Sequence, residues 1–91
     1  MEEMRDAVEA LHHCSAVYTG SFPVHAKVAQ GEVWDGVVEA FLLVGHEEAE
    51  RCYAWSCMEG GERRYIAILE VPPVSSPESA VRKAMADDQQ Q

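Results

Sequence analysis

The stretch VWDGVVEAFLLV, residues 33–44, decides the fold of this 91-residue chain. Its even positions, from Trp34 to Val44, are all apolar or small, whereas its odd positions mix Asp35 and Glu39 with apolar side chains. Successive side chains of a strand point to opposite faces of a sheet, so this period of two predicts a half-buried β-strand. We expect its even face to point toward the core.

Two further strands are expected after this one. Residues 51–58 are rich in aromatic side chains, and residues 64–71 form an almost continuous apolar run. Residues 59–62, Glu-Gly-Gly-Glu, predict a tight hairpin turn between them, because glycine adopts the positive φ values that such turns need.

The segment before residue 33 allows two interpretations. Residues 24–29 alternate weakly between apolar and polar side chains, and residues 30–32, Gln-Gly-Glu, have the composition of a turn. Residues 24–29 are therefore either a short edge strand paired through that turn or a loop. Residues 15–23 contain Gly20 and Pro23 and are expected to be a connection.

Helices are expected at both ends of the chain. Over residues 2–14 the apolar side chains follow the i, i+3, i+4, i+7 spacing of an amphipathic helix. Near the other end, Ser76 and Pro77 have the residue types of an N-cap and a first helical position. The apolar stripe of this second helix consists of Ala80, Val81, Ala84 and Met85.

These elements predict one α+β domain over residues 1–88, followed by a polar tail, residues 89–91. The order is α-β-β-β-β-α, or α-β-β-β-α if residues 24–29 are a loop. The strands should form a small antiparallel meander, and we expect both terminal helices to pack on one face of it. The other face would then be open to solvent or to a partner.

The net charge of −9 counts against nucleic acid as a partner, because a phosphate backbone would be repelled. The three-stranded version of this order is similar in topology to the double-stranded-RNA-binding domain, which holds phosphates with a lysine cluster at its second helix and a basic loop. The matching segments here, residues 76–79 and 45–50, are neutral or acidic. Binding would need one patch built from Arg63, Arg64, Arg82 and Lys83.

The cysteines and the N-terminus indicate a reducing compartment. The chain has an odd number of cysteines, which are Cys14, Cys52 and Cys57. Its N-terminus is acidic, whereas a secretory leader would be basic. We therefore expect free thiols in the cytoplasm. The longest apolar run, residues 40–44, is too short to span a bilayer. We expect no membrane association.

No metal or cofactor is expected from the histidines and cysteines. His12 and His13 are adjacent, so on a helix their side chains point about 100° apart. Cys52 and Cys57 are five apart and lie on opposite faces of a regular strand. Solvated histidines and isolated thiols are the simpler interpretation, although a cysteine–histidine pair formed in space stays open.

An enzymatic or small-ligand site is the alternative function, and we lean against it. Asp35, Glu39 and Glu70 could gather on one sheet face, and paired carboxylates can do acid–base chemistry. His46 and the cysteines could join them in a pocket. Exposed carboxylates are, however, expected in a chain as acidic as this one.

The leading hypothesis is a protein-interaction or self-associating domain, a homodimer for example, that uses the open sheet face or an edge strand. Phe41 lies on the face opposite the core-directed side of its strand, whereas Tyr53 and Trp55 share one face of theirs. If the register brings them together, an exposed aromatic patch results, which typically marks a binding surface. Alternatively, Tyr53 and Trp55 point at the helices. The candidate partner-binding residues are Val37, Phe41, Tyr53 and Trp55.

Overall fold

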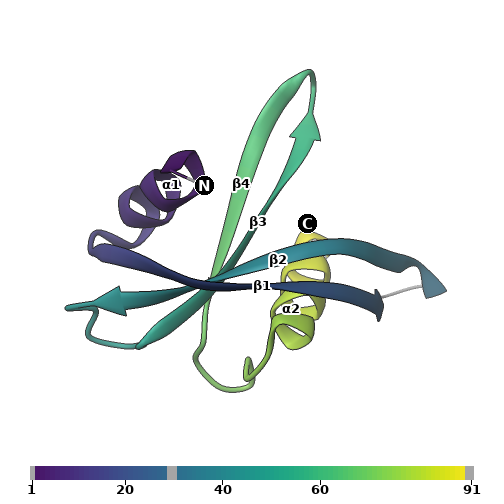
Figure 1. The fold of residues 1–91 in the computed structure, drawn as a ribbon. Helices are drawn as coiled ribbons and strands as arrows, with labels where there is room; N and C mark the ends of the chain where they lie inside the picture. Colours follow the sequence, from purple (N-terminus) through teal and green to yellow (C-terminus); the bar gives the residue numbers. More distant parts are fainter. Residues whose placement is uncertain (1, 29–30, 90–91) are drawn as a thin grey trace.

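The chain forms a four-stranded antiparallel meander with one helix at each end, as the computed structural model of residues 2–28 and 31–89 shows (Figure 1). The strands are neighbours in the order β1-β2-β3-β4. The predicted α+β fold class is confirmed. The elements are α1 (Glu2–His12), β1 (Ser15–Lys27), β2 (Val33–Val44), β3 (Arg51–Glu59), β4 (Glu62–Leu69) and α2 (Pro77–Gln89).

The two helices pack on opposite faces of the sheet, and the expectation that they share one face is wrong. Val81 of α2 packs in one core with Val38 and Trp55, whereas Val8 of α1 packs in a second core with Phe41. Val38 and Phe41 have opposite parity in β2 and therefore point to opposite faces. Both faces of β2 carry apolar side chains, so each face requires its own cover. In Figure 1 the helices lie to the left and right of the point where the two hairpins cross.

β1 is longer than the sequence suggested, because the residues expected to form a connection belong to the strand. Ser15–Lys27 pairs with β2 along its whole length, with a register shift between Tyr18 and Gly20. A bulge absorbs an extra residue at such a shift, and proline is tolerated in an edge strand, as Pro23 is here. The four-stranded order is therefore the one adopted, and the three-stranded order with its similarity to the RNA-binding domain is not.

The β3–β4 turn and the start of the second helix follow the predictions. Gly60 and Gly61 have φ values of 61° and 83° in the β3–β4 turn. Ser76 caps α2, since the Ser79 backbone N–H donates to its Oγ at 3.1 Å. α2 continues to Gln89, and the remaining tail residues, 90–91, lie outside the described part of the chain, as do residues 29–30 between β1 and β2.

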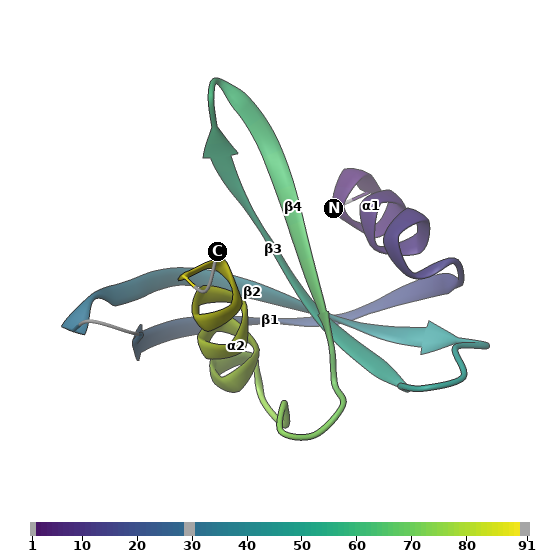
Figure 2. The same cartoon turned by 180° about the vertical axis from the view of Figure 1, so that it is seen from behind.

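The sheet splits along its middle. β2 and β3 pair only from Glu39–Ala54 to Leu42–Arg51 within the described residues, although each strand continues beyond that segment. The β1–β2 hairpin and the β3–β4 hairpin therefore diverge like two arms, as Figures 1 and 2 show. α2 fills the space between the arms on one face, where the rings of Trp34 and Trp55 meet edge to face at 5.7 Å. Neither described helix has the length and apolarity to cross a membrane.

Candidate functional site

The structure separates the four candidate partner-binding residues. Tyr53 and Trp55 are buried in the α2-side core, so they point toward a helix, as the second interpretation of the sequence allowed. Phe41 is buried under α1 on the other face. Val37 shares that face with Phe41 but lies past the helix and is 51% exposed. Of the two interpretations, the exposed aromatic patch is not the one adopted, and Val37 alone of the four is accessible to a partner.

The accessible surface around Val37 is the half of the α1 face that α1 leaves uncovered. We call it the open half, and it lies between the two diverging arms. Val33 and Val37 of β2 are exposed on one arm, and Met58 of β3 is 63% exposed on the other. Pro23 of β1 lies directly opposite Val37 in the register and is exposed as well. Exposed apolar side chains thus line both arms.

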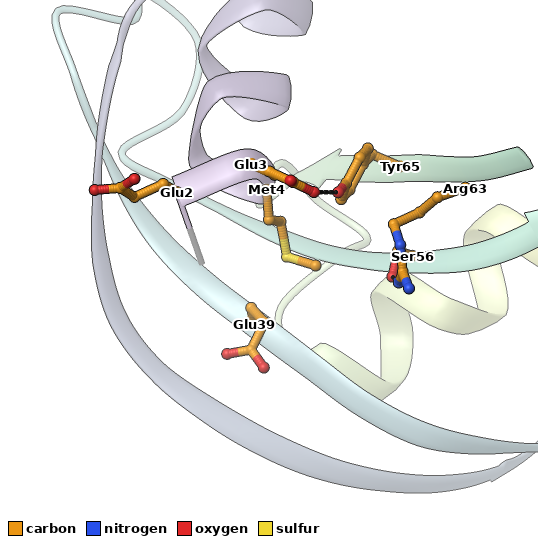
Figure 3. Close-up of a pocket in the computed structure, with 7 residues that line it drawn as sticks. All are labelled: Glu2, Glu3, Met4, Glu39, Ser56, Arg63 and Tyr65. Carbon is orange, nitrogen blue, oxygen red and sulfur yellow. Dashed lines mark hydrogen bonds between the residues drawn. The ribbon is translucent and has the colours of Figure 1, made fainter.

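A cavity of about 640 Å³ lies where the arms meet, beneath the N-terminal turn of α1 (Figure 3). It brings together α1, β2, β3 and β4, which are far apart in the sequence. The Tyr65 hydroxyl donates to Glu3 Oε2 at 3.0 Å, and Arg63 Nη1 donates to Ser56 Oγ at 2.9 Å. These two bonds tie α1 to β4 and β4 to β3. The lining residues are Glu2, Glu3, Met4, Glu39, Ser56, Arg63 and Tyr65.

Carboxylates outnumber cations around this cavity. Three carboxylates, those of Glu2, Glu3 and Glu39, line the cavity with one guanidinium, that of Arg63. Figure 3 shows the Glu2 carboxylate directed away from the others. Desolvation, followed by the hydrogen bond to Glu3, raises the pKa of Tyr65 above its ordinary value, so its hydroxyl keeps the donated proton further into the alkaline range. The Glu39 carboxylate accepts a hydrogen bond from Ser21 Oγ. The cavity therefore favours a positively charged group.

The groups proposed for an enzymatic site are not brought together. Glu70 accepts a hydrogen bond from the Tyr53 hydroxyl on the α2 side, whereas Glu39 lies on the α1 face. Asp35 is exposed and lies 3.8 Å from His25 Nδ1, and His46 belongs to the β2–β3 loop. Cys14, Cys52 and Cys57 are free thiols, and within the described residues no three histidine, cysteine or acidic side chains are placed to hold a metal ion.

The basic residues that nucleic-acid binding would require are mostly paired with carboxylates. Arg64 Nη1 lies 2.8 Å from Glu59 Oε2, and Lys83 Nζ lies 3.3 Å from Asp87 Oδ2. Arg82 forms an ion pair with Glu78 on α2. These contacts leave little uncompensated positive charge for a phosphate backbone.

The open half was only partly visible in the sequence. Val37 was identified from the period of β2. The contributions of Glu3 and Met4 to the adjoining cavity, where the arms meet, were missed. Glu3 and Tyr65 are 62 positions apart, and no local pattern signals their hydrogen bond. Searches against protein-family models, curated proteins and solved structures found no significant match to this chain.

Proposed function

We propose that this chain is a small protein-interaction domain that binds an extended segment of a partner protein in the open half of the α1 face. The observation that carries the proposal is the split sheet. β2 before Glu39 and β3 after Ala54 are not paired with one another, yet both present exposed apolar side chains on the same face. An extended peptide that adds to such a strand gains main-chain hydrogen bonds, and alternate side chains supply specificity.

The charge of the site defines the chemistry of the partner. The cavity where the arms meet favours a cation, and the whole chain carries a net charge of −9. Complementary charge raises the association rate and disfavours acidic partners. The proposed segment therefore carries apolar residues that contact Val33, Val37 and Met58, with a lysine or arginine directed toward Glu3 and Glu39. A reducing cytoplasm suits the free thiols and is part of the proposal.

Selection from a random peptide library displayed on phage, against the immobilised chain, tests this proposal. We expect the selected peptides to combine β-branched or aromatic residues with a basic residue. Their affinity should fall at least tenfold for Val37→Asp, because the substitution places a charge in the apolar contact. Val44→Asp is the matched control, since Val44 lies on the same strand, is 54% exposed and points to the other face.

Two results would contradict the proposal. One is a set of peptides whose affinity is unchanged by Val37→Asp. The other is a set of peptides that lose affinity equally in both variants, which would place binding outside the open half or indicate a general effect of charge. Raising the salt concentration should weaken binding to the wild-type chain, because the basic residue contributes electrostatically.

Self-association is the second candidate function, and a different surface favours it. Val17, Leu42 and Val44 are exposed on the α2 side of the sheet, and Val17 lies opposite Leu42 in the register. Sedimentation equilibrium over a range of concentrations tests it. A dimer that dissociates in Leu42→Asp but persists in Val37→Asp would establish this surface as the interface, whereas a monomer at all concentrations would exclude it.

A further inference from the structure

A second cavity, of about 290 Å³, lies at the other end of α1, between that helix and the β2–β3 loop. Two imidazoles meet there. The rings of His12, in the last turn of α1, and His46, in the loop, are 5.9 Å apart and nearly perpendicular. Both rings take part in hydrogen bonds that hold the α1 side of the fold together.

His46 shapes the loop through an atom that must be unprotonated. Its Nδ1 accepts the backbone N–H of Glu48 at 3.0 Å and that of Ala49 at 3.2 Å. An imidazole nitrogen accepts a hydrogen bond only while its lone pair is free. A proton on Nδ1 would point at the two backbone N–H groups, and neither hydrogen bond could form. Ala49 is buried in the α1-side core, so this loop conformation contributes directly to that core.

His12 ties the end of α1 to the far strand of the sheet. Its Nε2 lies 3.3 Å from the carbonyl oxygen of Ala67 on β4, to which Nε2–H donates. Burial lowers the pKa of His12, and the nearby His46 and His13 lower it further, while the hydrogen bond to the Ala67 carbonyl opposes them. The docked helix therefore binds protons less readily at His12 than a free histidine would.

The surrounding charges do not reverse this preference. Glu9, one turn earlier on α1, already accepts the backbone N–H of Ala16 at 2.8 Å. The β4 partner of His12 is a neutral carbonyl. The other titratable groups that line the cavity are His13 on the α1 side and two carboxylates of the loop, Glu47 and Glu48.

We infer that His12 and His46 form a pH-sensitive clasp that releases α1 from the sheet in mildly acidic solution. The direction follows from linkage. The folded pKa of His12 lies below the ordinary value of 6.5, so its contribution to docking is complete above pH 6.5 and is lost as pH falls through that value toward the folded pKa. The two backbone hydrogen bonds that His46 Nδ1 accepts hold the β2–β3 loop against the same end of α1, so the loop belongs to the clasp. Release would uncover Phe41 and Leu43 and remove the N-terminal turn of α1 from the cavity where the arms meet.

Amide hydrogen exchange of the whole chain, followed by NMR from pH 7.5 to pH 5 and corrected for intrinsic exchange rates, tests the clasp. We expect the α1 amides and that of Ala16 to lose at least tenfold in protection over this range. Amides of the α2-side core, such as those of Val38 and Trp55, should keep theirs. This measurement uses the chain without a partner, so its outcome is independent of the proposed function.

Substitutions that keep the hydrogen bonds but not the titration provide the decisive comparison. In His12→Gln/His46→Asn, a side-chain N–H can still reach Ala67 and an amide oxygen can still accept from the loop, so α1 protection should become independent of pH. His25→Asn, at an exposed histidine outside this cavity, is the matched control and should behave like the wild type. The clasp is excluded if wild-type α1 stays protected at pH 5, if protection is lost on both faces together, or if the double variant responds to pH like the wild type.

Discussion

The two sides of the sheet are held by different means. On the α2 side, Trp55 is almost fully buried against Trp34, and α2 contributes two fully buried residues, Ala80 and Val81. On the α1 side, the helix has one buried residue, Val8, and most of the sheet residues beneath it are small. Polar contacts complete the attachment of α1. They run from Glu9 to Ala16, from His12 to Ala67 and from Glu3 to Tyr65.

This difference indicates which side can move. Apolar burial stabilises a core at any ordinary pH, whereas hydrogen bonds accepted by titratable groups are lost on protonation, and a histidine that binds protons less readily in the folded state loses its contribution as the pH falls. We therefore expect the α2 side to supply the larger part of the stability, whereas the α1 side carries the open half, the cavity where the arms meet and the histidine pair.

The largest effect is expected from truncating the buried valine of each helix. Val81→Ala should lower the free energy of unfolding by about 2 kcal/mol, because two methyl groups leave a packed core. Val8→Ala should instead loosen α1 locally and lower the global value by less than half as much. Urea unfolding followed by tryptophan fluorescence measures the free energy of global unfolding. Amide exchange measures the local loosening of α1. Equal global losses would show that the two sides are equally integrated.

The next effect concerns close packing on the α2 side. A Cβ placed on Gly36 would lie 2.9 Å from the Trp34 ring, so Gly36→Ala should cost about 1–2 kcal/mol as the half-buried ring shifts. A Cβ on Gly20 would lie 3.7 Å from the Phe22 ring, which is ordinary contact. Gly20→Ala is therefore the matched control and should be near neutral in thermal unfolding. A neutral Gly36→Ala would mean that the α2 side is packed less tightly than described.

An alkaline pH dependence is expected from the α2 side. Desolvation, followed by the hydrogen bond to Glu70, raises the pKa of Tyr53 to about 12 from an ordinary value of 10.0. The folded state thus holds the hydroxyl proton of Tyr53 to a higher pH than the unfolded state does. The stability that this residue contributes is complete below pH 10 and is lost as the pH rises toward 12. Tyr53→Phe should lower the free energy of unfolding by about 1 kcal/mol at pH 8 and flatten its decrease between pH 10 and 12. Tyr18→Phe, at a half-exposed tyrosine, is the control and should leave this decrease unchanged. Urea unfolding at each pH measures both.

The smallest effect is expected at the polar tie between α1 and β1. Glu9→Ala leaves the Ala16 N–H without its carboxylate partner and should cost about 0.5 kcal/mol, visible as faster amide exchange in α1. Glu9→Gln keeps an acceptor oxygen and should restore most of the protection. Exchange in α2 serves as the internal reference. Slower or unchanged exchange in α1 for Glu9→Ala would remove this contact from the description of how α1 is attached.

Local patterns in the sequence predicted most of the fold. The period of residues 33–44 identified β2 with its observed bounds, the glycine pair identified the β3–β4 turn, and Ser76 identified the start of α2. β1 was underestimated because Gly20 and Pro23 are typical of loops. A bulge and an edge position accommodate them, and neither is visible without the pairing of strands.

The arrangement of the two faces could not be predicted in the same way. Phe41 and Leu43 made the second face of β2 apolar, but the sequence does not state which helix covers which face, because that depends on strand register and sheet twist. The candidate site was likewise predictable only where it depends on local pattern. Val37 was found from the period of its strand, whereas the Glu3–Tyr65 contact depends on where α1 docks.

Mapping a selected peptide onto the chain by NMR tests most directly whether the open half is the functional surface. Addition of a peptide from the library selection should shift the amide signals of residues 33–39 and 54–58 and of the first turn of α1, with little change at Val17 and Val44 or in α2. Shifts concentrated at Val17, Leu42 and Val44, or spread over α2, would contradict this account and place the binding surface on the opposite face.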